Sequence, residues 1–234
     1  MIIAIHQPNY IPWAGYFFKI LQSDIFVFLD DAQFSNGSFI NRTNIIVNSK
    51  KSWMSIPVKK KLGIKINQVA IADPKWKIKH LSKIKNTYIK CEHFSDIWNR
   101  INTLYESIES NYLFEINRKI IITISKWLDS NSKFFLSSSL NINENIKAEN
   151  KILEIVKCFK GITYISGKGG KNYQDEKNFI NDKVNLVYIE SLLKSYEQKQ
   201  NNEKFIPGLS ILDLFFNLGI EATKNYIYRN FKLL

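Results

Sequence analysis

The first thirty residues alternate between apolar runs and polar breaks, which predicts a strand, a helix and a second strand. Residues 1–5 form an apolar run that stops at His6, and the prolines at positions 8 and 12 prevent an uninterrupted helix after it. Residues 13–22 have helical periodicity, and residues 25–29 are an apolar run rich in β-forming side chains. The connection between the two strands is long enough for a right-handed crossover. We therefore expect them to be parallel and adjacent.

The rest of the chain predicts a mixture of short strands and amphipathic helices. Further strands are expected at residues 43–47, 53–58, 68–71, 162–165 and 184–188. Further helices are expected at residues 97–108, 113–128, 148–160, 174–180, 210–218 and 221–228. Ser210 is a candidate N-cap, and Gly219 is expected to separate the last two helices.

One more helix is expected after Asp73 and Pro74, which suit the N-cap and the first helical position. Its apolar stripe would consist of Ile78, Leu81, Ile84 and Tyr88, with lysines over much of the remaining surface. Residues 130–145 are polar and are expected to be a connection without regular structure.

Alternation of strands and helices at both ends of the chain predicts an α/β fold with a mostly parallel central sheet, flanking helices and a helical lobe in the middle of the chain. We expect one domain over residues 1–234. Within it, residues 1–72 form an N-terminal α/β part with the site loop, residues 73–130 the helical lobe, and residues 131–234 a second βαβ part with the C-terminal helices.

Composition narrows the class of protein. The chain has 234 residues, of which 45% are apolar and 23% charged, so it can bury a substantial core and is not a disordered or fibrous protein. Its two cysteines, Cys91 and Cys158, form no CxxC pair, which disfavours a disulfide framework and a structural zinc site. No apolar run approaches the roughly 18–20 residues of a membrane span, and no secretory leader is evident. The expected compartment is the cytoplasm.

The net charge of +12 is concentrated in one part of the chain. Residues 50–90 contain twelve lysines and one acidic residue, Asp73, a net charge of +11. Such a segment attracts an anionic partner, although lysine as a surface filler in a chain rich in Asn, Ile and Lys is an equally good interpretation. The segment contains no arginine, the residue that usually reads bases and phosphates with two hydrogen bonds. We therefore expect no sequence-specific binding to nucleic acid.

Candidate chemistry begins where the first two strands end. His6 and the pair Asp30 and Asp31 would lie at neighbouring carboxyl ends, where open α/β sheets usually bind ligands. A neutral imidazole near a carboxylate is a competent general base. The alternative is that His6 bonds a backbone carbonyl and that the two aspartates cap a loop.

Other polar residues are weaker candidates. Residues 33–42 form a loop rich in amides and hydroxyls, which ends in Arg42, a side chain suited to a phosphate or carboxylate. Residues 167–171, Gly-Lys-Gly-Gly-Lys, form either a tight turn or a phosphate cradle. Asp213 lies in an apolar helix and needs a partner. His80 and His93 have lesser claims. No GxSxG sequence, Cys/His pair or metal-ligand array is evident, so nucleophilic enzymes and metallohydrolases are disfavoured.

Seven stretches of the chain carry a likeness to a known family: HQPNYIPWAGYFFKI, DIFVFLDDAQF, FINRTNI, SWMSIPV, YISGKGGKNY, YEQ and FIPGLSILDLFFNLG. In this order and over nearly the whole chain, the sequence resembles the WbqC-like family. The resemblance implies a bacterial cytoplasmic protein from gene clusters for O-antigen, lipopolysaccharide and other surface glycans. It implies N-acyl or aminoacyl transfer to a nucleotide-linked amino sugar.

The resemblance also implies partners and roles for particular residues. The acyl donor would be a thioester on phosphopantetheine of an acidic carrier protein or on coenzyme A, with no tightly bound cofactor and no metal. His6 would be the base and Asp30 or Asp31 would orient it or hold the amine, while the basic segment would dock the carrier. The candidate substrate-binding residues are Gln7, Tyr10, Trp13, Tyr16, Gln33, Asn41, Arg42, His80, Ser166, Gly167, Tyr173, Gln198 and Asp213.

Two other functions stay open. His6 followed by Gly15 and Tyr16 loosely resembles the HxGH loop of nucleotidyltransferases, although Tyr16 stands where the second histidine would be. The chain could also be a non-catalytic binding module for glycan assembly, in which His6 is structural.

Overall fold

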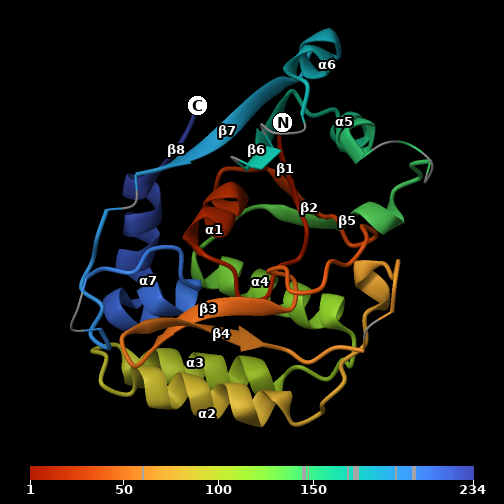
Figure 1. Ribbon diagram of the computed structural model, residues 1–234. Coiled ribbons are helices and arrows are strands. Elements are labelled where there is room, and N and C mark those ends of the chain that lie inside the picture. Colours follow the sequence, from red (N-terminus) through yellow and green to blue (C-terminus); the bar gives the residue numbers. More distant parts are fainter. Residues whose placement is uncertain are drawn as a thin grey trace.

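A six-stranded sheet forms the centre of the protein, as the computed structural model in Figure 1 shows. The structure describes residues 1–59, 61–143, 146, 148–167, 169–170, 174–192, 194–201 and 204–234. The strand order is β5 (Lys133–Leu136), β2 (Ile25–Phe28), β1 (Ile2–His6), β6 (Thr163–Ser166), β7 (Asn185–Ser191) and β8 (Phe231–Leu233). The first five strands are parallel and only β8 is antiparallel to its neighbour. The expected parallel pairing of the first two strands is confirmed.

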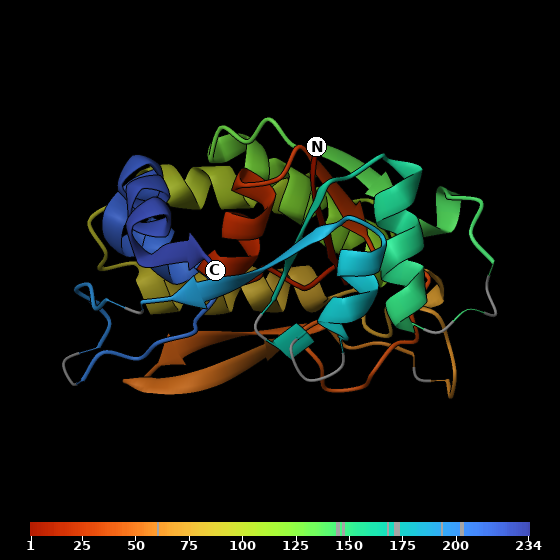
Figure 2. The same cartoon turned by 90° about the horizontal axis from the view of Figure 1, so that it is seen from above.

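The two faces of the sheet pack against different helices because successive side chains of a strand point to opposite faces. Ile3, Ile5 and Val27 belong to a smaller core with residues of α5 (Ala148–Cys158) and α6 (Glu176–Asn181). Ala4 and Phe26 belong to a larger core with α1 (Ala14–Leu21), α4 (Leu113–Trp127) and α7 (Ile211–Asn230). Figure 2 shows α5 and α6 apart from α1 and α7, with the strands of the sheet between them.

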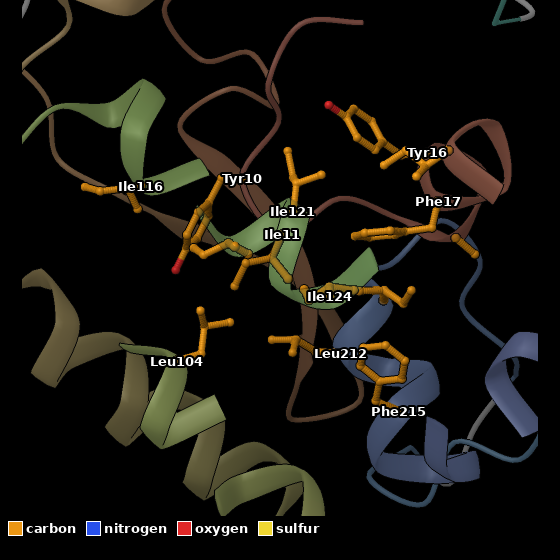
Figure 3. Close-up of a cluster of buried hydrophobic side chains, with 14 of the residues drawn as sticks. Tyr10, Ile11, Tyr16, Phe17, Leu104, Ile116, Ile121, Ile124, Leu212 and Phe215 are labelled. Carbon is orange, nitrogen blue, oxygen red and sulfur yellow. The ribbon is translucent and has the colours of Figure 1, made fainter. Parts of the chain in front are cut away.

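The larger core extends to a second layer below the sheet in the view of Figure 1. This layer contains a hairpin of β3 (Arg42–Val47) and β4 (Lys50–Ser55) and the helices α2 (Trp76–Tyr88) and α3 (Phe94–Glu106). Side chains from the loop after β1 and from α3, α4 and α7 meet there. Figure 3 shows Tyr10 and Ile11 among Leu104, Ile116 and Leu212.

Several elements differ from the sequence prediction. The second strand of the hairpin spans Lys50–Ser55 rather than 53–58, because Asn48 and Ser49 both have positive φ and form a two-residue turn that fixes its register against β3. Residues 68–71 are not a strand: Ile66–Gln68 is a 3₁₀ turn (η1), and Ala70 and Ile71 make only isolated bridges. The polar connection at 130–145 contains β5 and a second 3₁₀ turn, Ser137–Ser139 (η2).

The helix expected after Asp73 begins at Trp76, and Asp73 Oδ1 accepts a hydrogen bond from the Lys75 backbone N–H just before it. Its buried stripe is Trp76, His80, Ile84 and Tyr88, whereas Ile78 is 71% exposed. The prediction of Ile78 in the stripe was therefore wrong, because the helix presents an i, i+4 row that starts from Trp76.

The C-terminal helices follow the prediction more closely. Ser210 caps α7 by accepting a hydrogen bond from the Leu212 backbone N–H. Gly219 has φ 77° and interrupts the helical backbone inside α7, so the expected break is confirmed. The short strand β8, which the sequence did not predict, follows this helix and pairs with the end of β7.

Candidate functional site at the carboxyl ends of β1 and β6

A cavity of about 400 Å³ opens where β1 and β6 end. A smaller cavity of about 110 Å³ lies beside it and shares His6, Lys19 and Gly167 with it. The larger cavity is lined by Ile5, His6, Gln7, Lys19, Leu29, Ala32, Ile152, Tyr164, Ser166, Gly167, Gly169, Gly170 and Gln174. The smaller one adds Trp13, Gly15, Tyr16, Ile189 and Ser191. The position agrees with the usual ligand crevice of an open parallel sheet.

His6 is held in one orientation at the end of β1. Its Nδ1 lies 2.9 Å from the backbone oxygen of Gln7, and its ring packs edge to face on Tyr16 with centroids 4.8 Å apart. Because a carbonyl oxygen only accepts hydrogen bonds, the neutral imidazole carries its hydrogen on Nδ1 and keeps the lone pair on Nε2. Among the described residues, Nε2 has no hydrogen-bond partner. The imidazole thus offers a free acceptor to the cavity.

Burial and the charge of Lys19 lower the pKa of His6 to about 3, against the weaker opposing effect of the hydrogen bond to Gln7. The imidazole is therefore neutral throughout the physiological pH range. In the protein without ligand it is a weak base, and a bound group that offsets the charge of Lys19 would strengthen it.

Lys19, like Ser191, is a residue of this site that is absent from the candidates predicted from the sequence. It lies in α1, is 2% exposed, and donates a hydrogen bond from Nζ to the Ile5 backbone oxygen at 2.8 Å. No carboxylate of the described residues pairs with it, and burial lowers its pKa to about 7. The available signal was a lysine inside the run Ala14–Leu21, whose other residues are almost all apolar.

Two more polar groups of the cavities lack partners. The carboxamide of Gln7 makes no side-chain hydrogen bond among the described residues, while its backbone oxygen accepts from His6 and from the Tyr16 hydroxyl. The hydroxyl oxygen of Ser191 is buried in the wall of the smaller cavity without a partner. An unsatisfied buried hydroxyl such as that of Ser191 costs free energy, so a ligand that bonds to it would bind more tightly.

The turn after β6 closes one side of the larger cavity. Ser166 donates to the side-chain oxygen of Gln174 at 2.8 Å, and the Gly170 backbone N–H donates to the Gly167 oxygen. A Cβ on Gly170 would lie 2.2 Å from the Ser166 hydroxyl and 2.4 Å from Gln174 Oε1, so a larger residue there would displace these two side chains. The turn interpretation of this segment agrees with these bonds. Tyr173 lies outside the described residues.

The two aspartates do not line either cavity, although their neighbours Leu29 and Ala32 line the larger one. Asp30 is 1% exposed and accepts hydrogen bonds from Asn67 and from the Ser138 backbone N–H. These donors lie on η1 and η2, and no hydrogen bond joins either aspartate side chain to His6 among the described residues. The expectation that Asp30 or Asp31 orients His6 is therefore corrected, because the Gln7 carbonyl holds the imidazole.

Asp31 is bound to Lys151 at 2.5 Å and to the Ser137 hydroxyl at 2.5 Å. Burial alone would raise the pKa of Asp31, but the hydrogen bonds from Lys151 and Ser137 hold it below its usual value. Both carboxylates thus fix the loops after β2 and β5, as the alternative of loop capping supposed.

The polar loop at 33–42 lies outside the two cavities. Asn41 donates to the Ile56 oxygen, and the Arg42 guanidinium stacks on Trp53 at 3.8 Å from the ring centre. Gln33 forms a backbone bridge with Lys65. None of these three candidate residues lines the cavities, so the structure separates them from His6.

Two buried clusters away from the cavities contain four further candidate residues: Tyr10 and His80 in one, Gln198 and Asp213 in the other. Tyr10 bonds His80 Nδ1 at 2.7 Å, while His80 Nε2 lies 3.0 Å from the Ser55 oxygen. Asp213 accepts hydrogen bonds from Gln198 and Tyr196, among others. By contrast, Trp13, Tyr16, Gln7, Ser166 and Gly167 line the cavities together with His6.

Fold and site together define an α/β protein with a mostly parallel sheet and a ligand-sized cavity that contains a neutral imidazole and a lysine without a carboxylate partner among the described residues. The chain belongs to the WbqC-like protein family, whose profile matches residues 7–225.

A curated relative of the chain is the uncharacterized protein Rv1507c of Mycobacterium tuberculosis. It is 28% identical over 223 residues, which cover 94% of this chain and 95% of the relative. No solved structure matches the chain.

In the described part of the chain, no helix has the length and apolar character needed to cross a membrane. The same residues contain no group of three or more His, Cys, Asp or Glu side chains placed to hold a metal ion.

Proposed function

We propose that this protein is a transferase of bacterial surface-polysaccharide biosynthesis that moves an acyl or aminoacyl group from a thioester to the amine of a nucleotide-linked amino sugar. The observation that supports the proposal is the state of His6. Its imidazole is neutral, oriented by Gln7, and has an unpartnered Nε2 in a cavity of about 400 Å³. Transfer to an amine requires a proton acceptor in this state.

The proposed step is a direct transfer. The amine nitrogen of the sugar attacks the thioester carbonyl carbon, and a C–N bond forms. His6 Nε2 takes the proton that the nitrogen must lose, and the C–S bond breaks as the tetrahedral intermediate collapses. The imidazolium then returns the proton to the leaving thiolate, so that the products are an amide and a thiol.

The cavity offers groups for the remaining tasks. The Gln7 carboxamide is a donor for the oxyanion, and the Ser191 hydroxyl is a partner for a sugar hydroxyl in the adjoining space. The donor would be the thioester of phosphopantetheine on an acidic carrier protein or of coenzyme A. Exposed lysines of β4 and α2, such as Lys50 and Lys85, provide positive charge for a carrier.

The test is an activity screen of the whole chain by mass spectrometry. Nucleotide-linked amino sugars are offered with acyl thioesters of coenzyme A and of a carrier protein, and the mass gain of the sugar is measured. With a substrate in hand, His6→Ala should lower kcat/KM by about 10²–10⁴ fold, the usual contribution of a positioned base.

The control for this variant is His93→Gln, because His93 lies at the start of α3 outside both cavities. It should leave kcat/KM within about twofold. An unchanged rate in His6→Ala would overturn the proposed mechanism. Release of pyrophosphate from a nucleoside triphosphate, without any thioester, would show nucleotidyl transfer instead. Binding of the sugar nucleotide without turnover in any mixture would show a binding module.

A further inference from the structure

We propose that Lys19 is the anion-binding residue of the cavity and that it takes a phosphoryl or carboxylate group of the ligand. The inference goes beyond the proposed function, since any anionic ligand of this cavity would be held in the same way. It begins with the position of the side chain, which is 2% exposed and lines both cavities.

The first step is the hydrogen bonding of the ammonium group. An ammonium has three N–H donors, and Nζ of Lys19 uses one of them on the Ile5 oxygen. The described residues offer no second acceptor and no carboxylate to it. Buried charges in proteins are normally paired, because an unpaired one loses its hydration without compensation. The missing partner of Lys19 is therefore a negative group from outside the described part of the chain, which we assign to the ligand.

The second step is the charge of the surroundings. Among the described residues, those that line the two cavities include no Asp or Glu, and Asp30 and Asp31, which follow the lining residue Leu29, are occupied by donors of other loops. The described titratable side chains that share the cavities with Lys19 are His6 of β1, Tyr16 of α1 and Tyr164 of β6. None of them is negatively charged at neutral pH. In the described part of the chain, an anion entering the cavity thus meets Lys19, which is protonated once the anion is bound, and no competing carboxylate.

The third step connects the anion to His6. The charge of Lys19 is one of the causes that lower the pKa of His6, after burial. An anion bound to Lys19 offsets that charge, so it raises the pKa of the imidazole toward its ordinary value and makes it a better proton acceptor. Binding of the ligand and activation of the base are then one event.

The test is isothermal titration calorimetry of the whole chain with three anionic probes and one neutral probe. UDP-N-acetylglucosamine represents a diphosphate diester, coenzyme A a phosphopantetheine donor and sulfate a simple anion, while N-acetylglucosamine has no charge. At pH 8, we expect the wild type to bind an anionic probe with uptake of close to one proton, seen as a dependence of the heat on the ionisation enthalpy of the buffer. The reason is that burial lowers the pKa of Lys19 to about 7 in the free protein and a bound anion raises it.

Lys19→Met should weaken binding of that probe by at least tenfold and remove the proton uptake. Lys126→Met is the matched control, because Lys126 is exposed on α4 and its loss changes the net charge equally. It should leave both values unchanged. The probe that binds shows whether the anion is a diphosphate, a carrier arm or a simple ion.

Equal affinity of wild type and Lys19→Met, or no binding of any anionic probe, would overturn the assignment. If the variant fails to fold, the proton uptake of the wild type tests the assignment alone: uptake of close to one proton supports it, and binding without uptake overturns it. None of these measurements requires turnover, so a negative screen for acyl transfer leaves the outcome for Lys19 readable.

Discussion

Two buried polar regions of this protein, the cavity at His6 and Lys19 and the cluster around Asp213, differ in whether their polar atoms have partners. Asp213 is fully buried and accepts hydrogen bonds from Tyr88, Tyr196, Gln198 and Gln200. In the cavity, by contrast, Lys19 and Nε2 of His6 have unused bonding capacity.

Burial shifts pKa values in both regions, so a shifted pKa alone does not separate a structural cluster from a site. It raises the pKa of Asp213 to about 6 and lowers that of Lys19 to about 7. The separating feature is the number of unsatisfied atoms. The Asp213 cluster ties α7 to α2 and to the segment at 196–200, whereas the cavity keeps its bonding capacity for a ligand.

The largest expected effect is that of Asp213→Ala on stability. The change removes the acceptor of four hydrogen bonds in one buried cluster, and we expect a loss of roughly 3–5 kcal/mol in the free energy of unfolding. Urea denaturation followed by circular dichroism measures it. Asp96→Ala is the control, since Asp96 is exposed on α3 and its ion pair with Arg100 lies at the surface. A loss below about 1 kcal/mol would mean that the hydrogen bonds of the Asp213 cluster do not stabilise the fold as we infer.

The substitution Lys19→Met is expected to raise the free energy of unfolding, in contrast to Asp213→Ala. The pKa of Lys19 in the folded protein is about 7, below the 10.5 of the unfolded chain, so the unfolded state binds more protons between these two values. The free energy of unfolding should therefore rise with pH across this window. Below pH 7, Lys19 is charged in both states, and the full cost of burying its charge lowers the stability of the fold. We expect Lys19→Met to stabilise the protein by about 2–3 kcal/mol at pH 6.

The difference in free energy of unfolding between Lys19→Met and wild type should shrink as the pH approaches 10. Chemical denaturation of both proteins at several pH values measures this convergence. A stability difference that stays constant from pH 6 to pH 10 would show that Lys19 is not desolvated as the structure indicates.

A smaller loss of stability is expected for Tyr105→Phe, in the hydrogen-bonded chain that contains the buried His80. The hydroxyl of Tyr105 bonds Tyr10, which in turn bonds His80, and His80 bonds the Ser55 oxygen, so this chain of bonds is complete. Tyr105→Phe removes one bond at its end, and we expect a loss of about 1–2 kcal/mol in the free energy of unfolding. Thermal unfolding at pH 7 measures it, with the exposed Tyr228→Phe as control. No loss would show that the Tyr10 hydroxyl is satisfied without Tyr105.

The sheet could be predicted from the sequence because its central strands are apolar runs of the right length and their crossovers are long enough for parallel pairing. Two strands could not be predicted. β5, of sequence Lys-Phe-Phe-Leu, is short and sits among serines, and β8 depends on pairing with the distant end of β7. In both cases the neighbouring strand, rather than the local pattern, determines the structure.

The site could be predicted only in part. His6 was found because it directly follows a strand that must lie in the sheet. The roles of Asp30 and Asp31 depended on which neighbouring loop supplies donors, and that loop follows the unpredicted strand β5. Lys19 occupies a buried position of a helix that has no solvated face for it; the apolar run around it is the signal in the sequence, and its place at the cavity follows from the packing.

His6→Ala is expected to have the smallest effect on stability, and it best distinguishes the cavity from the Asp213 cluster. His6 makes one side-chain hydrogen bond, to the Gln7 oxygen, and its Nε2 has no partner in the described part of the chain. Removing the ring leaves no buried donor unpaired, and a carbonyl at a cavity wall can bond water instead. We expect a change of less than about 1 kcal/mol in the free energy of unfolding. Urea denaturation at pH 7 checks it, beside Asp213→Ala under the same conditions. If His6→Ala loses activity but keeps its stability, the imidazole acts in the reaction. A stability loss as large as that of Asp213→Ala would show instead that His6 has a structural role.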